Sequence, residues 1–423
     1  MSRFTFSRRS GWLSSRNRRN APPNPLTLLT KNQFLLFIAA VTFLPGCNGS
    51  TQPQFIDQAV PIRAVRVRLL EDVTRADFAV KGPYVVTDDD DNVLRRYSSS
   101  DPFQVLADKS GIVVNGWLVK ANTLCIKPVS FGTVRVRDRR YRGWLRVIRN
   151  PADSKLMVVN HVPLEQYVAG VLGGELPRSF HSQTFRAQAV AARTYVLHRM
   201  LNTSRTSWDV ASTAASQVYR GIDGESSKTK SAQRATHGQV LVYTQQGRHQ
   251  IIITFYSSTC GGGARPAWEL KDVPHIEPLG GVKIDQCQAS PYHTWKETPV
   301  FTKQELHAKL AKADSQIRRM KSISKVRIAS RWPHGRARDI RITDQRGRSV
   351  TVSAETVRIA LGLRSTWFDI VDKSDSVSFT NGRGWGHGMG MCQFGADRLA
   401  RRGYKYEEIL ETYYPGSELK RYY

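Results

Sequence analysis

The stretch from Ser182 to Met200, SQTFRAQAVAARTYVLHRM, has a strong helical pattern. Its apolar residues recur at spacings of three and four, the period of an α-helix with a buried face; they are Phe185, Ala189, Ala192, Val196 and Met200. Apolar residues make up 40% of the 423-residue chain, so the composition is that of a packed globular protein and excludes a disordered or collagen-like one. Taken alone, the stretch predicts a core helix with a solvated Arg193.

The residues before this helix follow a different period. From Pro61 to about residue 159, apolar and charged residues alternate, as in Val65-Arg66-Val67 and Val134-Arg135-Val136. Such alternation is typical of antiparallel strands with one solvated face. We therefore expect an α+β fold, with a strand-rich N-terminal region at 59–160 and a mixed helix and strand region at 161–423 that forms a cleft.

The segment that leads into the helix, VPLEQYVAGVLGGELP (162–177), contains two glutamates, and the second, Glu175, lies between Gly174 and Leu176-Pro177. Val162–Tyr167 predicts a short helix, and Gly173–Pro177 predicts a loop that ends it. A carboxyl group beside apolar residues loses solvation, so its pKa rises, and Glu175 becomes a candidate general acid near neutral pH. A helix-capping or ion-paired glutamate is the alternative.

A second unusual segment, GRGWGHGMG (382–390), has glycine at every second position. One interpretation is an extended strand with a bare face, which would present Arg383, Trp385 and His387 on the other face. These side chains suit hydrogen bonding to, and stacking on, a sugar or a base. The alternative is a glycine-rich bend whose residues adopt positive φ.

The N-terminus predicts export. Residues 1–47 contain seven Lys and Arg residues and no acidic residue, and the apolar run Phe34–Pro45 is too short to span a bilayer as a helix. The run ends in Leu44-Pro45-Gly46-Cys47, which resembles a bacterial lipoprotein signal with Cys47 as the lipid anchor. We expect an exported, membrane-anchored lipoprotein of the cell envelope, with a linker at 48–58. A buried core segment is the alternative.

The charge is strongly basic, with 63 Lys and Arg against 35 Asp and Glu and a net charge of +28. Residues 301–350 alone hold 14 basic and four acidic residues. No nucleic-acid-binding module is recognisable, and the signal segment directs the chain away from the genome, so we expect no nucleic acid as partner. Cell-wall polymers and anionic lipid head groups are the expected counter-charges; a solvated basic face is the alternative.

Four cysteines remain beyond the anchor: Cys125, Cys260, Cys287 and Cys392. An exported protein occupies a compartment that permits disulfides, and four cysteines allow three complete pairings. Cys260 and Cys287 could form a bridge, share a metal, or stay two separate buried thiols. The sequence does not choose between these alternatives.

Three groups of segments resemble the stage II sporulation protein D family, which includes the amidase-enhancer proteins. They are VPLEQYVAGVLGGELP (162–177) with AQAVAARTYVL (187–197); FYSSTCGG (255–262) with SPYHTW (290–295); and LGLRSTWF (361–368), GRGWGHGMGMCQFGA (382–396) and ILETYYPGSEL (409–419). Their order and spacing fit over about residues 155–420. The resemblance implies a lytic transglycosylase that cuts bacterial cell-wall glycan, preferably strands stripped of stem peptides, and it makes 161–423 the catalytic region.

The resemblance also implies roles for single residues. Glu175 corresponds to the family's catalytic glutamate, Arg193 to the arginine of the following helix, and His387 to the histidine of the glycine-rich segment. By the same likeness, Tyr292 and Trp295 lie in the substrate cleft; Arg383 and Trp385 are expected to bind substrate because of the pattern of the glycine-rich segment. One carboxyl group suffices for such a reaction, because an internal sugar hydroxyl replaces the second.

Some family members bind zinc through neighbouring Cys and His residues. Here Ser257 stands where a histidine is common, and no histidine closely follows Cys260, so we expect neither a metal nor another cofactor. The resemblance leaves two functional classes open. The chain is either the enzyme, acting on peptidoglycan glycan strands, or a non-catalytic glycan-binding protein that stimulates a cell-wall amidase.

Overall fold

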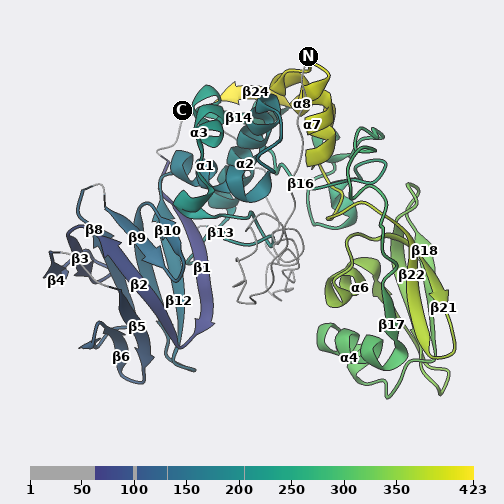
Figure 1. Cartoon of the computed structure of the whole chain (residues 1–423), viewed down its shortest axis with the longest axis horizontal. Helices are drawn as coiled ribbons and strands as arrows, with labels where there is room; N and C mark the ends of the chain where they lie inside the picture. The colour runs from purple at the N-terminus through teal and green to yellow at the C-terminus, as the bar shows by residue number, and fades with distance from the viewer. Residues whose placement is uncertain (1–61, 99–101, 131, 204) are drawn as a thin grey trace, which may run out of the picture. The chain divides into compact units, whose positions relative to one another are not determined.

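The computed structural model describes residues 62–98, 102–130, 132–203 and 205–423 (Figure 1). The predicted signal segment at 1–47, its anchor Cys47 and the linker at 48–58 lie outside these residues. Within the described ranges, no helix combines the length and the apolar character needed to cross a membrane. Helices and several sheets are both present, so the predicted α+β class is confirmed.

The N-terminal strands form two sheets that share one core. The strands are β1 Val65–Val73, β2 Arg75–Lys81, β3 Tyr84–Thr87, β4 Val93–Tyr97, β5 Phe103–Asp108, β6 Gly111–Val114, β7 Trp117–Val119, β8 Thr123–Pro128, β9 Thr133–Val136, β10 Arg139–Tyr141, β11 Trp144–Asn150, β12 Lys155–Val162 and β13 Val210–Ala211. One sheet has the order β13-β1-β12-β11-β8-β3-β4 and the other β10-β9-β2-β5-β6-β7. The predicted alternation is confirmed in β1, where Val65 and Val67 are fully buried and Arg66 between them is partly exposed.

The next part of the structure consists of helices and short strands packed around one long helix. Its elements are α1 Leu164–Glu175, α2 Ser182–Asn202, α3 Ser227–Ala235, β14 Gln239–Gln245, β15 Arg248–Ile251, β16 Tyr256–Ser257, β23 Met391–Cys392, α7 Gln393–Arg401, α8 Tyr406–Tyr413 and β24 Glu418–Arg421. Figure 1 shows α2 among α1, α3, α7 and α8, so α7 and α8, near the C-terminal end, pack on the long helix. The short strands β16 and β23 pair in parallel and bring residues 256 and 391 side by side.

The predicted helix at 182–200 is confirmed, and it is buried on two faces rather than one. The predicted apolar face, which includes Phe185, Ala189 and Val196, packs in the core shared with the N-terminal sheets. Ala187, Val190 and Ala191 pack in a second core with β23, α7 and α8. A helix enclosed in this way leaves no solvated side for its middle residues, which is why the expected solvated Arg193 is wrong.

Residues between about 295 and 383 enclose a third core of their own. The elements are β17 Val300–Thr302, α4 Lys303–Ala313, α5 Ser315–Arg318, β18 Lys325–Arg331, β19 Ala337–Thr343, β20 Ser349–Ser353, α6 Ala354–Leu361, β21 Trp367–Asp372 and β22 Ser376–Arg383. They form two three-stranded sheets, β17-β22-β21 and β18-β19-β20, with α4 and α6 in the same core. The predicted mixed region therefore contains two packed parts.

Two local expectations are corrected by the structure. Gly173, Gly174 and Glu175 belong to α1 instead of forming a loop after it. In the glycine-rich segment the interpretation as a bend is the right one, because Gly384, Gly386, Gly388 and Gly390 have φ of 77°, 107°, 74° and 60°. An extended strand with alternating faces is not compatible with these backbone angles.

Candidate active site

Glu175 is the last residue of α1, and two glycines bring it against a neighbouring backbone. An ideal Cβ on Gly173 would lie 1.8 Å from the carbonyl oxygen of Gly224, and one on Gly174 would lie 2.0 Å from that of Val218. Only glycine allows such a close approach, so both residues are required by packing and not by a break in the helix. The end of α1 thus lies directly on residues 218–224.

This close packing gives the Glu175 carboxylate a fixed partner. The Val218 N–H donates to Glu175 Oε1 at 2.6 Å, and the Gln393 side-chain amide lies 3.4 Å from Oε2. The side chain is half-buried, and burial raises the pKa of Glu175 above its ordinary value, although hydrogen bonds from Val218, Gln393 and Tyr256 act in the opposite direction. The group therefore holds a proton at a pH where an exposed glutamate does not, as a general acid must.

A network of uncharged polar side chains surrounds this carboxyl group. Gln217 donates to the Tyr256 hydroxyl at 2.9 Å and accepts from the Tyr167 hydroxyl at 2.8 Å. On the other side, the Gln393 amide lies 3.4 Å from Gln188 Oε1 as well as from Glu175. These amides and hydroxyls can exchange donor and acceptor roles, so they can support Glu175 in both protonation states.

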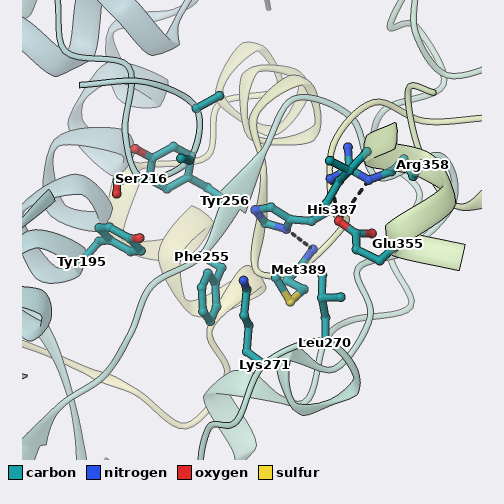
Figure 2. A pocket seen from close by; sticks show the side chains of 13 residues that line it. Tyr195, Ser216, Phe255, Tyr256, Leu270, Lys271, Glu355, Arg358, His387 and Met389 are labelled. Atoms are coloured by element: carbon teal, nitrogen blue, oxygen red, sulfur yellow. Dashed lines mark hydrogen bonds and ion pairs between the residues drawn. The ribbon is translucent and has the colours of Figure 1, made fainter. Parts of the chain in front are cut away.

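An open pocket of about 110 Å³ lies next to this network (Figure 2). Tyr256 lines the pocket and is also a hydrogen-bond partner of Glu175, which itself lies outside the lining. Aromatic rings form one side and charged groups the other; the labelled lining residues are Tyr195, Ser216, Phe255, Tyr256, Leu270, Lys271, Glu355, Arg358, His387 and Met389. A concave site with aromatic walls and a few polar groups is typical of small-molecule and sugar recognition.

His387 presents a neutral ring to this pocket. Its Nδ1 accepts from the Met389 N–H at 3.0 Å, which assigns the ring proton to Nε2. Burial lowers the pKa of His387 to about 3, and the positive charges of Arg265, Arg358 and Lys271 lower it further against the effect of Glu355. The ring is therefore an uncharged hydrogen-bond donor across the physiological pH range.

Tyr292 and Trp385 lie close together. Their rings meet edge to face with centroids 4.5 Å apart, and Tyr292 also contacts Phe394 at 5.7 Å. Phe394 follows Gln393, the amide beside Glu175. Arg364 lies over the Trp385 ring at 5.1 Å, and Arg383 lies over the Trp367 ring at 5.2 Å. Aromatic and basic groups thus continue along the glycine-rich segment.

The side chains of Arg193 and Trp295 form contacts within the protein. Arg193 is fully buried and forms a two-point ion pair with Glu165, at 2.7 Å and 2.8 Å. Burial would raise the pKa of Glu165, but Arg193, with Tyr423 and Gln233, lowers it to about 2. The Trp295 ring packs on Gly382, and its N–H donates to the Gly384 carbonyl at 2.8 Å. The substrate-binding roles inferred for both residues stay predictions.

Several residues at the site were not singled out from the sequence. Tyr256 and Gln393 lie inside the quoted segments FYSSTCGG and GRGWGHGMGMCQFGA, so the segments themselves were the available signal. Lys271 and Glu355 line the pocket from parts of the chain without any motif. The Val218 N–H is a backbone group, and no side-chain pattern could have indicated it.

Comparison with known proteins gives two family models and several relatives. The model described as Stage II sporulation protein matches residues 152–243, and the Domain of unknown function (DUF8618) matches residues 283–390. The chain is 30% identical to stage II sporulation protein D of Bacillus subtilis over 279 residues, which covers 62% of this chain and 75% of that protein.

Two further relatives cover more of this chain. It is 29% identical to an uncharacterized protein of Brachyspira hyodysenteriae, over 85% of this chain and 93% of that protein. It is 27% identical to the amidase enhancer of Bacillus subtilis, over 71% of this chain and 47% of that protein.

Proposed function

The chain belongs to the stage II sporulation protein D family, and on this premise we propose that it is a peptidoglycan lytic transglycosylase. It cleaves the MurNAc–GlcNAc bond of glycan strands that have lost their stem peptides and leaves 1,6-anhydroMurNAc ends. A role related to the cell wall is supported by the relatives named stage II sporulation protein D and amidase enhancer.

The observation that carries this proposal is the state of Glu175, a half-buried carboxyl group with a raised pKa and a fixed backbone donor. In the first step it gives its proton to the glycosidic oxygen as the bond from that oxygen to C1 of MurNAc breaks. In the second step the carboxylate takes the proton of the C6 hydroxyl, whose oxygen forms a bond to C1. The acid is regenerated, and no water is consumed.

A single carboxyl group is consistent with the surroundings of Glu175. Hydrolytic glycosidases use a pair of carboxyl groups about 5–9.5 Å apart, one of which activates water or attacks the sugar. The partners of Glu175 described above are a backbone N–H, amides and hydroxyls. The internal C6 hydroxyl makes a second carboxylate unnecessary.

The adjoining pocket supplies groups that fit a sugar without its peptide. The Nε2–H of His387 can donate to a sugar oxygen, and Tyr195, Phe255 and Tyr256 provide apolar ring surface. Figure 2 shows the Lys271 ammonium directed into the pocket. Removal of the stem peptide uncovers a lactyl carboxylate on MurNAc, and a cation in the pocket favours that carboxylate over an amide-linked peptide.

Arg193 supports the proposal as a positioning residue. Its ion pair with Glu165 connects α2 to the first turn of α1, the helix that ends in Glu175. A buried pair of this kind fixes the relative orientation of two helices, so Arg193 would hold the acid in place from a distance.

The basic surface suits a partner in the cell envelope. Lys325, Arg327 and Arg341 are exposed on the β18–β19 hairpin, where Arg327 and Arg341 face each other across the strands. Like charges in cross-strand pairs are destabilising, and an anionic polymer or lipid surface would relieve this repulsion. The proposal includes export and attachment to the membrane through a lipid on Cys47.

The second candidate is a non-catalytic glycan-binding protein that stimulates a cell-wall amidase. The similarity to the amidase enhancer of Bacillus subtilis favours it. The paired rings of Tyr292 and Trp385 would serve glycan binding under either candidate.

The experiment that separates the two candidates is mass spectrometry of the products released from peptide-stripped glycan. The wild-type protein should release fragments with anhydro ends, and Glu175→Gln should release them at least about 10²-fold more slowly while it still binds glycan. Glu407→Gln, which changes an exposed glutamate on α8, is the matched control and should keep full activity. Undiminished release by Glu175→Gln would refute the assigned role of this residue. No release by the wild type, together with stimulation of an amidase by both proteins, would establish the second candidate.

A further inference from the structure

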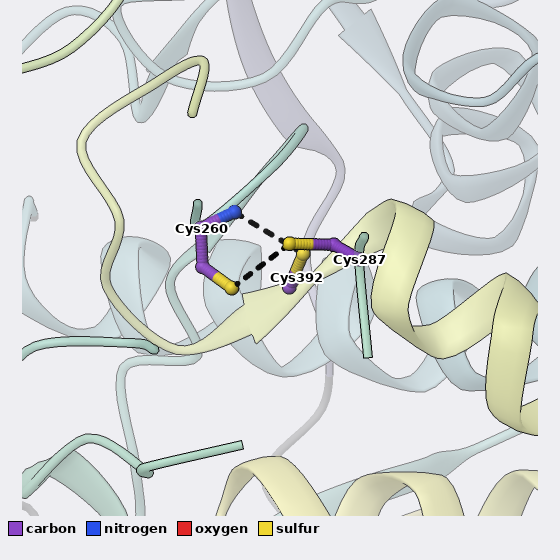
Figure 3. Close-up of side chains that lie close together, drawn as sticks. All are labelled: Cys260, Cys287 and Cys392. Atoms are coloured by element: carbon purple, nitrogen blue, oxygen red, sulfur yellow. Dashed lines mark hydrogen bonds between the residues drawn. The ribbon is translucent and has the colours of Figure 1, made fainter. Parts of the chain in front are cut away.

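Three buried cysteines from distant parts of the chain meet beside the candidate active site (Figure 3). Cys260 follows β16, Cys287 lies in the irregular segment after it, and Cys392 ends β23 and precedes α7. The sulfur atoms of Cys260 and Cys287 are 3.4 Å apart, and the three Sγ atoms all lie within 4.8 Å of one another.

This spacing fits a thiophilic metal ion. Zinc binds cysteine sulfur at about 2.3 Å in a tetrahedron, whose edge between two sulfurs is then about 3.8 Å. The sulfurs here surround a point at which each could reach such a distance with small side-chain movements. Cys125 provides a contrast, because it is buried alone in β8, far along the chain from this cluster.

The backbone around the cluster offers N–H groups to the sulfurs. The Cys260 N–H donates to Cys392 Sγ at 3.2 Å, and the N–H groups of Gly262 and Gly263 donate to the Cys260 sulfur. Hydrogen bonds from backbone N–H groups favour thiolates, which are the form that binds metals. Three thiolates buried together also need a cation between them, because their mutual repulsion is not screened by water.

A further pair of donors adjoins Cys287. Asp285 Oδ1 lies 3.5 Å from Cys287 Sγ, and His293 Nε2 lies 3.1 Å from Asp285 Oδ2. One ligand atom each of Asp285, Cys287 and His293 lies within 4.8 Å of the others, so the two donor groups share Cys287. A histidine is a common fourth ligand beside three thiolates, and a carboxylate commonly holds such a histidine in position.

We propose that Cys260, Cys287 and Cys392 bind one Zn²⁺ ion, with the Asp285–His293 pair completing its coordination. This set differs from the neighbouring Cys and His residues expected for zinc in some family members, because it does not involve position 257. The sequence-based expectation of no metal rests on Ser257 and on the lack of a histidine closely after Cys260, and it leaves Cys392 out. The folded chain brings Cys287 and Cys392 to Cys260 from 27 and 132 positions away.

The zinc site would have a structural role, and it would lie close to the candidate active site. Cys392 is followed by Gln393, whose amide lies beside Glu175, and Cys260 follows Tyr256 by four residues. An ion bound by these cysteines would fix the paired strands β16 and β23 and the start of α7 relative to each other. The inference goes beyond the proposed function, since it holds whether the protein cuts glycan or only binds it.

The test is the metal content of the full-length chain purified without chelator, measured by elemental analysis. We expect about one zinc ion per chain, and less than about a tenth of that in Cys260→Ser, Cys287→Ser and Cys392→Ser. Cys125→Ser is the matched control and should retain the ion, because Cys125 lies outside the cluster. His293→Ala should bind zinc about 10-fold to 100-fold more weakly, as removal of an outer or fourth ligand does.

Two results would overturn the proposal, and the first does not depend on any variant folding. A wild-type chain that holds no zinc, takes up none after reduction and addition of Zn²⁺, and shows a Cys260–Cys287 disulfide by mass spectrometry after alkylation would establish a redox pair instead. Full zinc content in all three cysteine variants would place the ion elsewhere. Cobalt substitution gives an independent reading, since thiolate-to-cobalt absorption should appear in the wild type and in Cys125→Ser and disappear in Cys392→Ser.

Discussion

Replacement of Gly174 by alanine tests whether close packing of α1 sets the position of Glu175, the proposed catalytic acid. The added methyl group would lie 2.0 Å from the Val218 carbonyl oxygen. The shortest ordinary contact is about 3.4 Å, so the two backbones would have to separate by about 1.4 Å. Val218 is also the residue whose N–H binds Glu175 at 2.6 Å, so this separation would lengthen or break that hydrogen bond.

The expected cost in stability is modest and the expected cost in activity is large. Overpacking costs about 1–3 kcal/mol, while alanine in a helix gains about 1 kcal/mol over glycine, so the net loss is about 0–2 kcal/mol. Displacement of a catalytic group by about 1 Å can cost on the order of 10²-fold in rate. We therefore expect Gly174→Ala to unfold within a few degrees of the wild type and to release anhydro products about 10²-fold more slowly.

The pH dependence of kcat/KM tests the same reasoning through the direction in which its alkaline limb moves. The Val218 N–H lowers the pKa of Glu175, so its loss should raise that pKa further. Because the acid must be protonated, activity declines above its pKa, and the alkaline limb of kcat/KM should move to higher pH in the variant. Gln166→Ala, on the exposed side of α1, is the control and should leave both rate and profile unchanged. Wild-type activity with an unshifted alkaline limb in Gly174→Ala would refute the reasoning.

The remaining predictions concern two buried groups. Arg193→Met leaves the Glu165 carboxylate buried without its partner and should reduce the free energy of unfolding by about 3–5 kcal/mol, measured by denaturant titration. The pKa of Glu165 is about 2 in the folded chain, against an ordinary value of 4.5. The ion pair therefore stabilises the fold fully above pH 4.5, and this contribution disappears as the pH falls towards 2. If the free energies of unfolding of wild type and variant differed by the same amount at about pH 3 and at about pH 7, this reasoning would be wrong. His387→Asn removes the Nε2 donor and should slow the formation of anhydro products roughly 10-fold to 100-fold. Since the pKa of His387 is about 3, the pH profile between about 5 and 8 should keep its shape, and a lost or displaced limb in this variant would show that the ring titrates during catalysis.

The features that the sequence predicted well are those with a local physical cause. The helix from Ser182 was visible because its apolar period needs only neighbouring residues, and the structure has it at Ser182–Asn202. The alternation of β1 and the α+β class were predicted for the same reason. Glu175 could be singled out because its carboxyl group lies beside apolar residues, and the resemblance to a family implied that it is the catalytic glutamate.

The sequence failed where glycine or charge has a long-range cause. The sequence predicts a loop at Gly173 and Gly174, yet both residues lie inside α1, because the backbones of Val218 and Gly224 pass close by. Arg193 was expected in solvent, yet α2 is enclosed on two faces and the guanidinium pairs with Glu165. In both cases the deciding neighbour lies many residues away, and no local pattern reports it.

Periodicity and composition act over a few residues, so the sequence alone predicts the periodic elements, the fold class and Glu175 as a candidate acid. Only the tertiary structure decided which groups surround that acid: the Val218 N–H, the Gln393 amide and the pocket that holds His387. It alone also brought Cys260, Cys287 and Cys392 within reach of one ion. The physical reason is that a proton's affinity for a carboxylate and a metal's affinity for thiols depend on distances of a few ångströms between residues that folding, and not chain order, makes neighbours.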